Sequence, residues 1–263
     1  MSRTTLSDAS PPETSPIDTT NDNIPASDPS PRFLCAHLPD AAGSTVALDK
    51  DQARHATRAL RLSVGDRLQL IDGRGTSAKA TLTAADPDQT TCTIESIQHT
   101  PAPTPRIELA TAIPKGPRAD SMVNDLAQLG TDLLIPLITQ RSVVHPRDNK
   151  LDRFAKAAAE AGKQSGNAWF MQINEPTPFA DVLVCDAELT LIADPYAKPV
   201  ADLVSQLKSV KTVRILVGPE GGLTDQELSA ARDAGFTPWC YSPNVLRIET
   251  AAIAAVAILR AQA

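Results

Sequence analysis

Apolar and polar positions follow two different patterns along this chain of 263 residues. Between residues 32 and 98, short β-rich segments alternate with turn-forming residues such as Gly73 and Gly75. This pattern predicts strands at residues 45–48, 67–71, 78–82 and 92–97, with one helix at residues 49–62. Short strands around a single helix indicate a small β-barrel.

The predicted helix begins at Asp49, whose carboxylate can cap it together with Gln52 in a variant of the capping box. Residues at i, i+3 and i+7 form the stripe that we expect to be buried: Ala53, Ala56 and Leu60.

A second stripe on the same helix consists of Arg54, Arg58 and Arg61. Three guanidinium groups on one face can follow a phosphate backbone, because each can donate two hydrogen bonds to anionic oxygens. This is the best nucleic-acid signal in the chain. The alternative is a solvated charged face, since residues 32–98 contain eight basic and eight acidic residues.

The second pattern follows a proline-rich segment at residues 101–106. Beyond it, apolar runs typical of strands alternate with helical periods. The strands are predicted at residues 107–113, 133–137, 189–193, 213–217 and 237–241. The helices are predicted at residues 119–129, 151–164, 200–207, 224–234 and 249–261. Such alternation indicates an α/β domain with a parallel sheet covered on both faces.

The chain therefore divides into a tail at residues 1–31, a barrel at 32–100, a linker at 101–106 and an α/β domain at 107–263. The tail has five acidic residues and one basic residue, and 17 of its residues are Ser, Thr or Pro. Such a composition predicts disorder. The tail also accounts for most of the net charge of −6, so the overall acidity does not argue against a nucleic-acid partner.

Composition excludes several classes of protein. Apolar residues make up 42% of the chain and charged residues 21%, which is typical of a soluble globular protein. No apolar run is long enough to cross a bilayer, and the acidic N-terminus has no secretory or transit signal. The four cysteines and four histidines are scattered, so we expect no metal site and free thiols in the cytoplasm.

Two loops late in the chain could carry chemistry. The first, Gly218-Pro219-Glu220-Gly221-Gly222, follows a predicted strand and precedes a helix capped by Thr224 and Glu227. In open α/β sheets, ligands bind beyond the carboxyl ends of the strands. Glycines there let the main chain approach a ligand closely. A plain tight turn is the alternative.

The second loop, residues 242–247, leads into a helix of Ala, Ile and Val. Arg247 and Glu249 lie at the start of this helix, where Glu249 would complement the helix dipole. Capping is the alternative role for Glu249. The helix itself has no polar face, so we expect it to be buried against the sheet and a second subunit.

These residues resemble a known family. The runs LVGPEGGLTDQE at residues 216–227 and VLRIETAAIAA at residues 245–255 look like the C-terminal motifs of the ribosomal RNA small subunit methyltransferase E family. Residues 32–82 resemble its PUA-like barrel. Its central motifs are matched by Lys115, Arg118, Leu129-Gly130, Pro136, Arg141-Ser142, Glu160-Ala161 and Gln164-Ser165.

The resemblance implies a SPOUT-type α/β domain with a deep trefoil knot, preceded by a PUA-like barrel. Members of the family methylate N3 of a uridine in 16S rRNA of the small ribosomal subunit, using S-adenosyl-L-methionine, and act as homodimers. It implies three cofactor loops, with the candidate residues Ala193, Gly218, Glu220, Gly221, Gly222, Tyr241 and Leu246.

Methylation of uridine N3 requires loss of a proton and stabilisation of charge on the neighbouring carbonyl oxygens. We predict Glu249 or Glu220 as the group that accepts the proton or orients the substrate, and Arg247 as the stabiliser. The predicted RNA contacts are Arg54, Arg58, Arg61, Lys115 and Arg118.

Some positions depart from the family pattern. Gln128 stands where a glutamate is usual, Asn167 and Asn244 where arginines are usual, Ser242 where glycine is common, and Ile248 where threonine is common. Two alternatives therefore stay open: a non-catalytic RNA-binding homologue, and methylation of a different RNA position.

Overall fold

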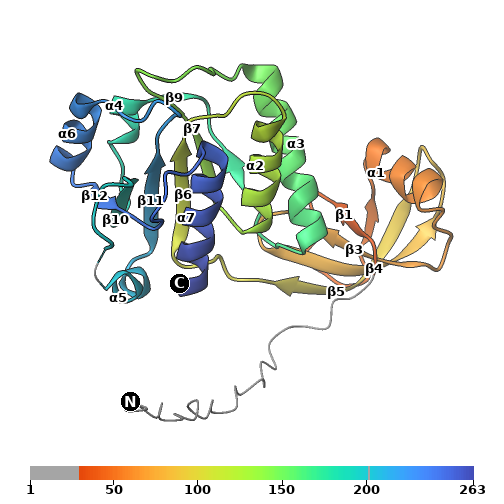
Figure 1. Ribbon diagram of the computed structural model, residues 1–263. Helices are drawn as coiled ribbons and strands as arrows, with labels where there is room; N and C mark the ends of the chain where they lie inside the picture. Colours follow the sequence, from red (N-terminus) through yellow and green to blue (C-terminus); the bar gives the residue numbers. More distant parts are fainter. Residues whose placement is uncertain (1–29, 201) are drawn as a thin grey trace, which may run out of the picture. The chain divides into compact units, whose positions relative to one another are not determined.

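A computed structural model describes residues 30–200 and 202–263, and it contains two sheets (Figure 1). Residues 1–29 of the tail, which the sequence predicts to be disordered, lie outside the described residues. Residues Pro31–Ala263 form one compact unit, in which each sheet has its own apolar core.

The first sheet has five strands in the order β1-β3-β4-β5-β2. Their bounds are Arg32–Leu34 (β1), Thr45–Ala47 (β2), Arg67–Ile71 (β3), Thr76–Ala84 (β4) and Thr91–His99 (β5). All four predicted strands of this sheet are present. Strand β1 is not predicted from the sequence, because its three residues show no alternation of apolar and polar side chains. In the described part of the chain, no hydrogen-bonded pairing joins β1 to β2, so the sheet is not a fully paired barrel.

The helix of this sheet differs from the prediction. It consists of α1 (Lys50–Arg54) followed by a π-helical turn (His55–Ala59), and Arg61 then adopts a left-handed φ of 55°. Asp49 caps α1 as predicted, but Gln52 Oε1 accepts instead from Leu34 N at 3.2 Å. Leu60 is 43% exposed rather than buried, because the wider π turn and the early helix end carry it out of the apolar stripe.

The second sheet is parallel throughout, in the order β12-β10-β11-β6-β7-β8, and β9 pairs with β7. Its strands are β6 (Arg106–Thr111), β7 (Leu133–Ile138), β8 (Gln172–Ile173), β9 (Thr177–Pro178), β10 (Leu189–Ala193), β11 (Thr212–Val217) and β12 (Thr237–Trp239). The parallel α/β prediction is confirmed. The prediction lacks strands β8 and β9, because each has only two residues and so cannot show the alternating pattern of a strand.

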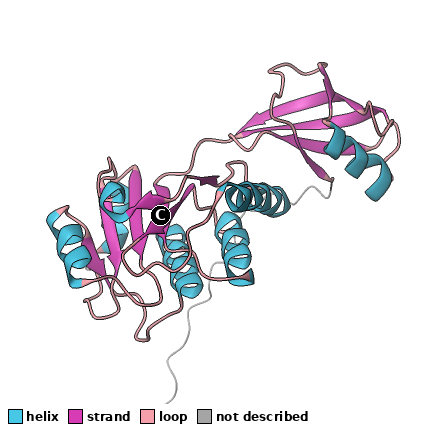
Figure 2. Ribbon diagram, turned by 90° about the horizontal axis from the view of Figure 1, so that it is seen from above, coloured by secondary structure: helices cyan, strands magenta, loops and turns pink. Residues whose placement is uncertain are grey.

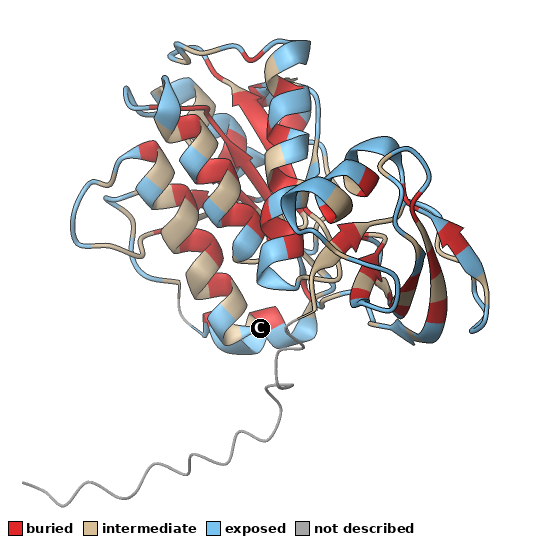
Figure 3. Cartoon of the chain, turned by 90° about the vertical axis from the view of Figure 1, so that its right-hand side faces the viewer, coloured by how far each residue is buried: buried red, intermediate tan, exposed pale blue. Residues whose placement is uncertain are grey.

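Helices cover both faces of this sheet, as Figure 1 and Figure 2 show. The helices are α2 (Pro117–Gln128), α3 (Asp148–Ser165), α4 (Phe179–Val182), α5 (Leu203–Ser209), α6 (Asp225–Asp233) and α7 (Ile248–Gln262). One apolar core contains residues of α2, α3, α5 and α7, and the opposite core contains residues of α4 and α6. Figure 3 shows the buried residues on the strands and on the inward faces of these helices. The prediction also lacks the four residues of α4.

The segment after α3 contacts the first sheet. Gly75 N donates to Ala168 O at 2.9 Å, and Phe170 N donates to Gly73 O at 2.9 Å. Trp169 Nε1 donates to Thr100 O at 3.0 Å. These main-chain and indole hydrogen bonds connect the β3–β4 turn to the α/β sheet, and they join the two sheets in one unit.

Candidate active site

Three loops meet at one edge of the parallel sheet because β12, β10 and β11 are neighbours. The predicted cofactor residues all lie in these loops or at their starts. Ala193 ends β10, Gly218 follows β11, and Tyr241 follows β12 by two residues. The structure thus brings together segments that are up to about 50 residues apart in the sequence.

The loop after β11, residues 218–222, presents exposed main chain. Gly221 and Gly222 are exposed, and Gly222 has a φ of 69° with no atom within 4 Å of the place where a side-chain carbon would lie. At Gly218, a side-chain carbon would approach Leu223 to 3.0 Å. Close packing on Leu223 therefore favours glycine at Gly218, and the positive φ favours glycine at Gly222.

The loop after β12 is fixed through Tyr241. Its hydroxyl donates to Ala251 O at 3.0 Å, and its ring lies 4.5 Å from that of Trp239. Burial raises the pKa of Tyr241 above its ordinary value, so the phenol keeps the proton of this hydrogen bond well into the alkaline range. Leu246, in the same loop, is half-buried.

An arginine and two carboxylates meet beside these loops. Arg118 Nη1 lies 3.4 Å from Glu249 Oε1, and Arg118 Nη2 lies 3.7 Å from Glu220 Oε1. Arg118 is in the first turn of α2, Glu220 in the glycine loop and Glu249 in the first turn of α7. The other carboxylate oxygen of Glu249 is buried and has no hydrogen-bond partner among the described residues.

The structure does not pair the two predicted catalytic residues, Arg247 and Glu249, with each other. Arg247 is exposed, and among the described residues its guanidinium makes no hydrogen bond or ion pair. Arg118, which is predicted to contact RNA, instead reaches both carboxylates. Lys115 is exposed in the loop between β6 and α2.

The arginine stripe lies far from the three loops in the sequence. Arg54 ends α1, Arg58 is in the π turn and Arg61 follows that turn. Arg54, Arg58 and Arg61 are all exposed. Leu60 and Val64 are exposed near them in the sequence, at 43% and 63%. The exposed surface of this segment thus combines three arginines with two apolar side chains. Its role in RNA binding stays a prediction.

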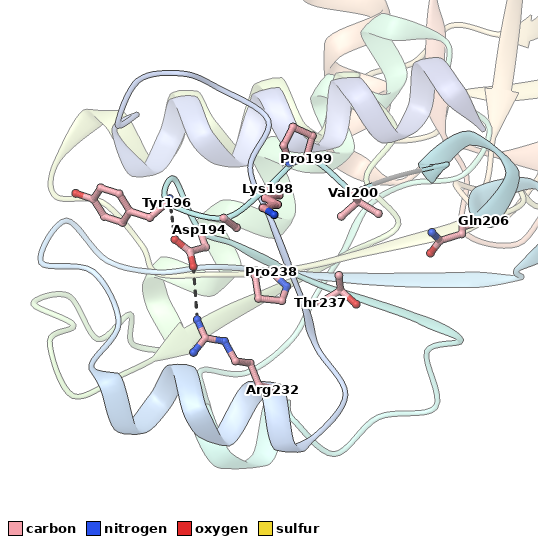
Figure 4. Close-up of a pocket in the computed structure, with 10 residues that line it drawn as sticks. Asp194, Tyr196, Lys198, Pro199, Val200, Gln206, Arg232, Thr237 and Pro238 are labelled. Atoms are coloured by element: carbon pink, nitrogen blue, oxygen red, sulfur yellow. Dashed lines mark hydrogen bonds and ion pairs between the residues drawn. The ribbon is translucent and has the colours of Figure 1, made fainter.

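A cavity of about 610 Å³ lies next to the loop after β10 (Figure 4). Its lining includes Asp194, Lys198, Gln206, Arg232 and Thr237. Asp194 and Arg232, which both line it, form an ion pair with 3.8 Å between Asp194 Oδ2 and Arg232 Nη2. Residues 218–222 and Leu246 do not line this cavity, so it is distinct from the glycine loop.

Neither a membrane span nor a metal cluster is found in residues 30–200 and 202–263. Each helix in these two ranges is too short or too polar to cross a bilayer. The same ranges contain no group of three or more His, Cys, Asp or Glu side chains that could hold a metal ion.

Comparison with known proteins agrees with this architecture. Residues 100–260 match the RNA methyltransferase domain family, and residues 48–95 match the RNA methyltransferase PUA domain family. The chain therefore has the two domains of an RNA methyltransferase.

A more specific relationship follows from individual proteins. The protein named ribosomal RNA small subunit methyltransferase E from Synechocystis sp. is 30% identical over 225 residues, which cover 83% of this chain and 73% of that protein. The chain belongs to the ribosomal RNA small subunit methyltransferase E family. This confirms the resemblance found in the motifs at residues 216–227 and 245–255.

Solved structures give the same result. The ribosomal RNA small subunit methyltransferase E from Neisseria gonorrhoeae, bound to S-adenosyl methionine, is 28% identical with a TM-score of 0.80, over 88% of this chain and 97% of that chain. A methyltransferase from Legionella pneumophila, solved with bound cofactor SAM, is 27% identical with a TM-score of 0.79 and the same coverage.

Proposed function

We propose that this protein transfers a methyl group from S-adenosylmethionine to N3 of a uridine in 16S rRNA of the small ribosomal subunit. The observation that supports this proposal best has two parts. The loops after β10, β11 and β12 follow neighbouring strands, and Arg118 contacts both Glu220 in the glycine loop and Glu249 at the start of α7. A small-subunit substrate also implies a cytoplasmic location.

The residues of the three loops fit the methyl donor. Gly222 N donates to Pro219 O and Gly221 O accepts from Arg141, which leaves Gly221 N and Gly222 O to hydrogen-bond to polar groups of a ligand. Tyr241 offers an aromatic wall. Glu220 and Glu249 place two carboxylates beside Arg118, and a carboxylate close to the bound donor would favour its sulfonium cation. When bound, S-adenosylmethionine supplies an electrophilic methyl group.

Alignment and proton removal are the tasks left to the chain. The loops hold donor and acceptor at contact distance and exclude water. A carboxylate at Glu249 accepts the N3 proton, and Arg247 stabilises the charge that develops on the uracil oxygens. Glu249 suits this role better than Glu220, because its side chain is 16% exposed whereas that of Glu220 is 45% exposed.

A trefoil knot is part of this proposal. Strand β12 lies at the sheet edge beside β10, whereas α7 packs on β6 and β11. The end of β12 and the residue after it contact the loop after β10: Asp194 N donates to Trp239 O at 3.1 Å, and Cys240 N donates to Lys198 O at 3.4 Å. These contacts support threading of residues 240–247 through that loop.

A homodimer completes the proposed site. Helix α7 buries Ala252, Ala255 and Val256 but leaves Ala254, Ala257 and Ile258 half-buried. This small-residue face permits close approach of a second subunit. Sedimentation of the full chain tests the assembly: a monomer at micromolar concentration contradicts it.

The test of activity uses small subunits from a strain that lacks the enzyme. We expect wild-type protein to methylate them and mass spectrometry of the rRNA to locate the methyl group on N3 of one uridine. Arg247→Ala and Glu249→Gln should each lower kcat about 100-fold. Near-wild-type turnover in both removes the assigned roles. Cofactor binding without any turnover by the wild-type protein favours the non-catalytic RNA-binding alternative. A methyl group at another position of the rRNA favours the alternative of a different target position.

A further inference from the structure

The glycine loop is held by an arginine from a distant part of the chain. Arg141 Nη1 donates to Gly221 O at 2.8 Å and lies 3.5 Å from Leu223 O. The aliphatic part of the side chain runs along the loop, because a side-chain carbon at Gly221 would meet Arg141 Cδ at 3.4 Å. Arg141 thus contacts both the carbonyls and the open side of this loop.

The turn that carries Arg141 is itself fixed. It follows β7, and Thr139 N donates to Ser142 Oγ at 2.9 Å while Ser142 N donates to Thr139 O at 3.1 Å. Ser142 Oγ also lies 3.4 Å from Leu137 O. A turn closed by its own hydrogen bonds presents Arg141 in one position.

A second contact joins this turn to α6, the helix that follows the glycine loop. Gln140 N donates to Glu227 Oε1 at 2.8 Å. Glu227 Oε2 accepts from Thr224 N at 2.8 Å and completes the capping box of α6. The glycine loop and the helix after it are therefore both anchored to the turn at residues 139–142.

Three glycines in five residues give the loop at 218–222 a large conformational freedom that binding must remove. A loop already held in its binding conformation loses less entropy when the ligand arrives, which raises affinity. We propose that Arg141 is a positioning residue that holds the glycine loop ready for the methyl donor. The inference rests on the proposed function, because it takes this loop to bind S-adenosylmethionine.

Arg141 differs from Arg118 in what it can affect. Arg118 contacts Glu220 on the same loop, but it also contacts Glu249, which belongs to the proposed chemistry. Among the described residues, Arg141 forms no hydrogen bond or ion pair with either carboxylate. Its removal is therefore expected to change cofactor affinity and to leave the methyl-transfer step nearly unchanged.

The experiment measures S-adenosylhomocysteine binding to the full chain by calorimetry. We expect Arg141→Ala to raise Kd about tenfold and Arg141→Lys to return it to within about threefold of wild type, because an ammonium can still donate to Gly221 O. Hydrogen exchange of the amides at residues 218–224 should speed up in Arg141→Ala. With saturating cofactor, kcat should change less than about threefold.

Arg147→Ala is the matched control, since Arg147 is exposed in the next segment and its side chain makes no hydrogen bond or ion pair among the described residues. Equal Kd values for wild type, Arg141→Ala and Arg147→Ala would overturn the inference. So would a loss of affinity in Arg141→Lys as large as in Arg141→Ala. Failure of the wild-type protein to bind S-adenosylhomocysteine would instead contradict the proposed function.

Discussion

Arg214 and Glu108 form a nearly buried ion pair between two adjacent strands of the parallel sheet. They are register partners in β11 and β6, and Arg214 donates from Nε at 2.9 Å and from Nη2 at 2.6 Å to Glu108 Oε2. Their side chains are 13% and 12% exposed. Arg214 Nη1 also donates to Val182 O at 3.0 Å, which ties the pair to α4.

Removal of one partner should be strongly destabilising. Glu108→Ala leaves the Arg214 guanidinium desolvated beside an empty site, and breaking a buried pair in this way costs about 3–5 kcal/mol of unfolding free energy. Urea unfolding of the full chain measures the loss. Asp120→Ala is the control, because Asp120 pairs with Arg153 at the surface at 2.9 Å. That pair is worth less than about 1 kcal/mol. Equal losses in the two variants contradict the prediction.

The contact between the first sheet and Trp169 can be tested at a glycine. A side-chain carbon at Gly75 would lie 2.5 Å from Trp169 Cζ2 and 2.8 Å from Thr100 O. Gly65 has the same φ of 95°, but nothing lies within 4 Å of its position. Gly65→Ala therefore reports the backbone strain alone, about 1–2 kcal/mol.

Gly75→Ala adds a steric clash to the same strain. We expect it to lose about 1–3 kcal/mol more than Gly65→Ala, as is typical of overpacking. Thermal and urea unfolding measure the difference. If the two alanine variants have the same stability, Trp169 does not pack on the β3–β4 turn in the way described.

The sequence predicts the long elements of the second sheet because their periods are clear. Strand β10 has the predicted bounds, and α6 has the predicted capping box between Thr224 and Glu227. Short elements such as β8 and α4 escape prediction, since two to four residues cannot show a period of 2.0 or 3.6. The π turn at residues 55–59 also escapes it, because its residue pattern suits an α-helix equally well.

The sequence predicts the loops of the candidate site but not its contacts. Glycines and turn residues mark the loops after β11 and β12 directly in the sequence. The pairing of Arg118 with Glu249 depends on strand order, which places β6 beside β11 and α7 against both. The role of Arg141 follows from its reach across β6 to Gly221. Its only signal in the sequence is the Arg141-Ser142 motif, which gives no partner.

The arginine stripe gives a prediction about salt dependence. Binding of the rRNA substrate should weaken as salt rises, because each phosphate contact releases bound counterions. Replacing Arg54, Arg58 and Arg61 together by Ala should lower the slope of log K against log salt by about 2. Filter binding at several salt concentrations measures it. The control removes three exposed lysines elsewhere: Lys156, Lys208 and Lys211. An equal change in both triple variants supports the solvated-face alternative.

The buried thiol of Cys92 predicts how stability depends on pH. Cys92 is fully buried in the core of the first sheet, and burial raises the pKa of its thiol from 9.0 to about 11. Between these values the unfolded chain has lost the thiol proton while the folded chain keeps it. The folded state therefore binds more protons, and stability falls as the pH rises through this window.

The Cys92 contribution can be isolated by comparing slopes. Between about pH 8.5 and pH 10.5, wild type should lose about 2 kcal/mol through this thiol, and Cys92→Ala should lack that part of the loss. Ile94→Val is the control, because Ile94 lies on β5 in the same core and has no titratable group. It should lower stability by about 0.5–1.5 kcal/mol at every pH and keep the wild-type slope. Urea unfolding at both pH values gives the comparison, and a Cys92→Ala slope equal to that of wild type contradicts the prediction.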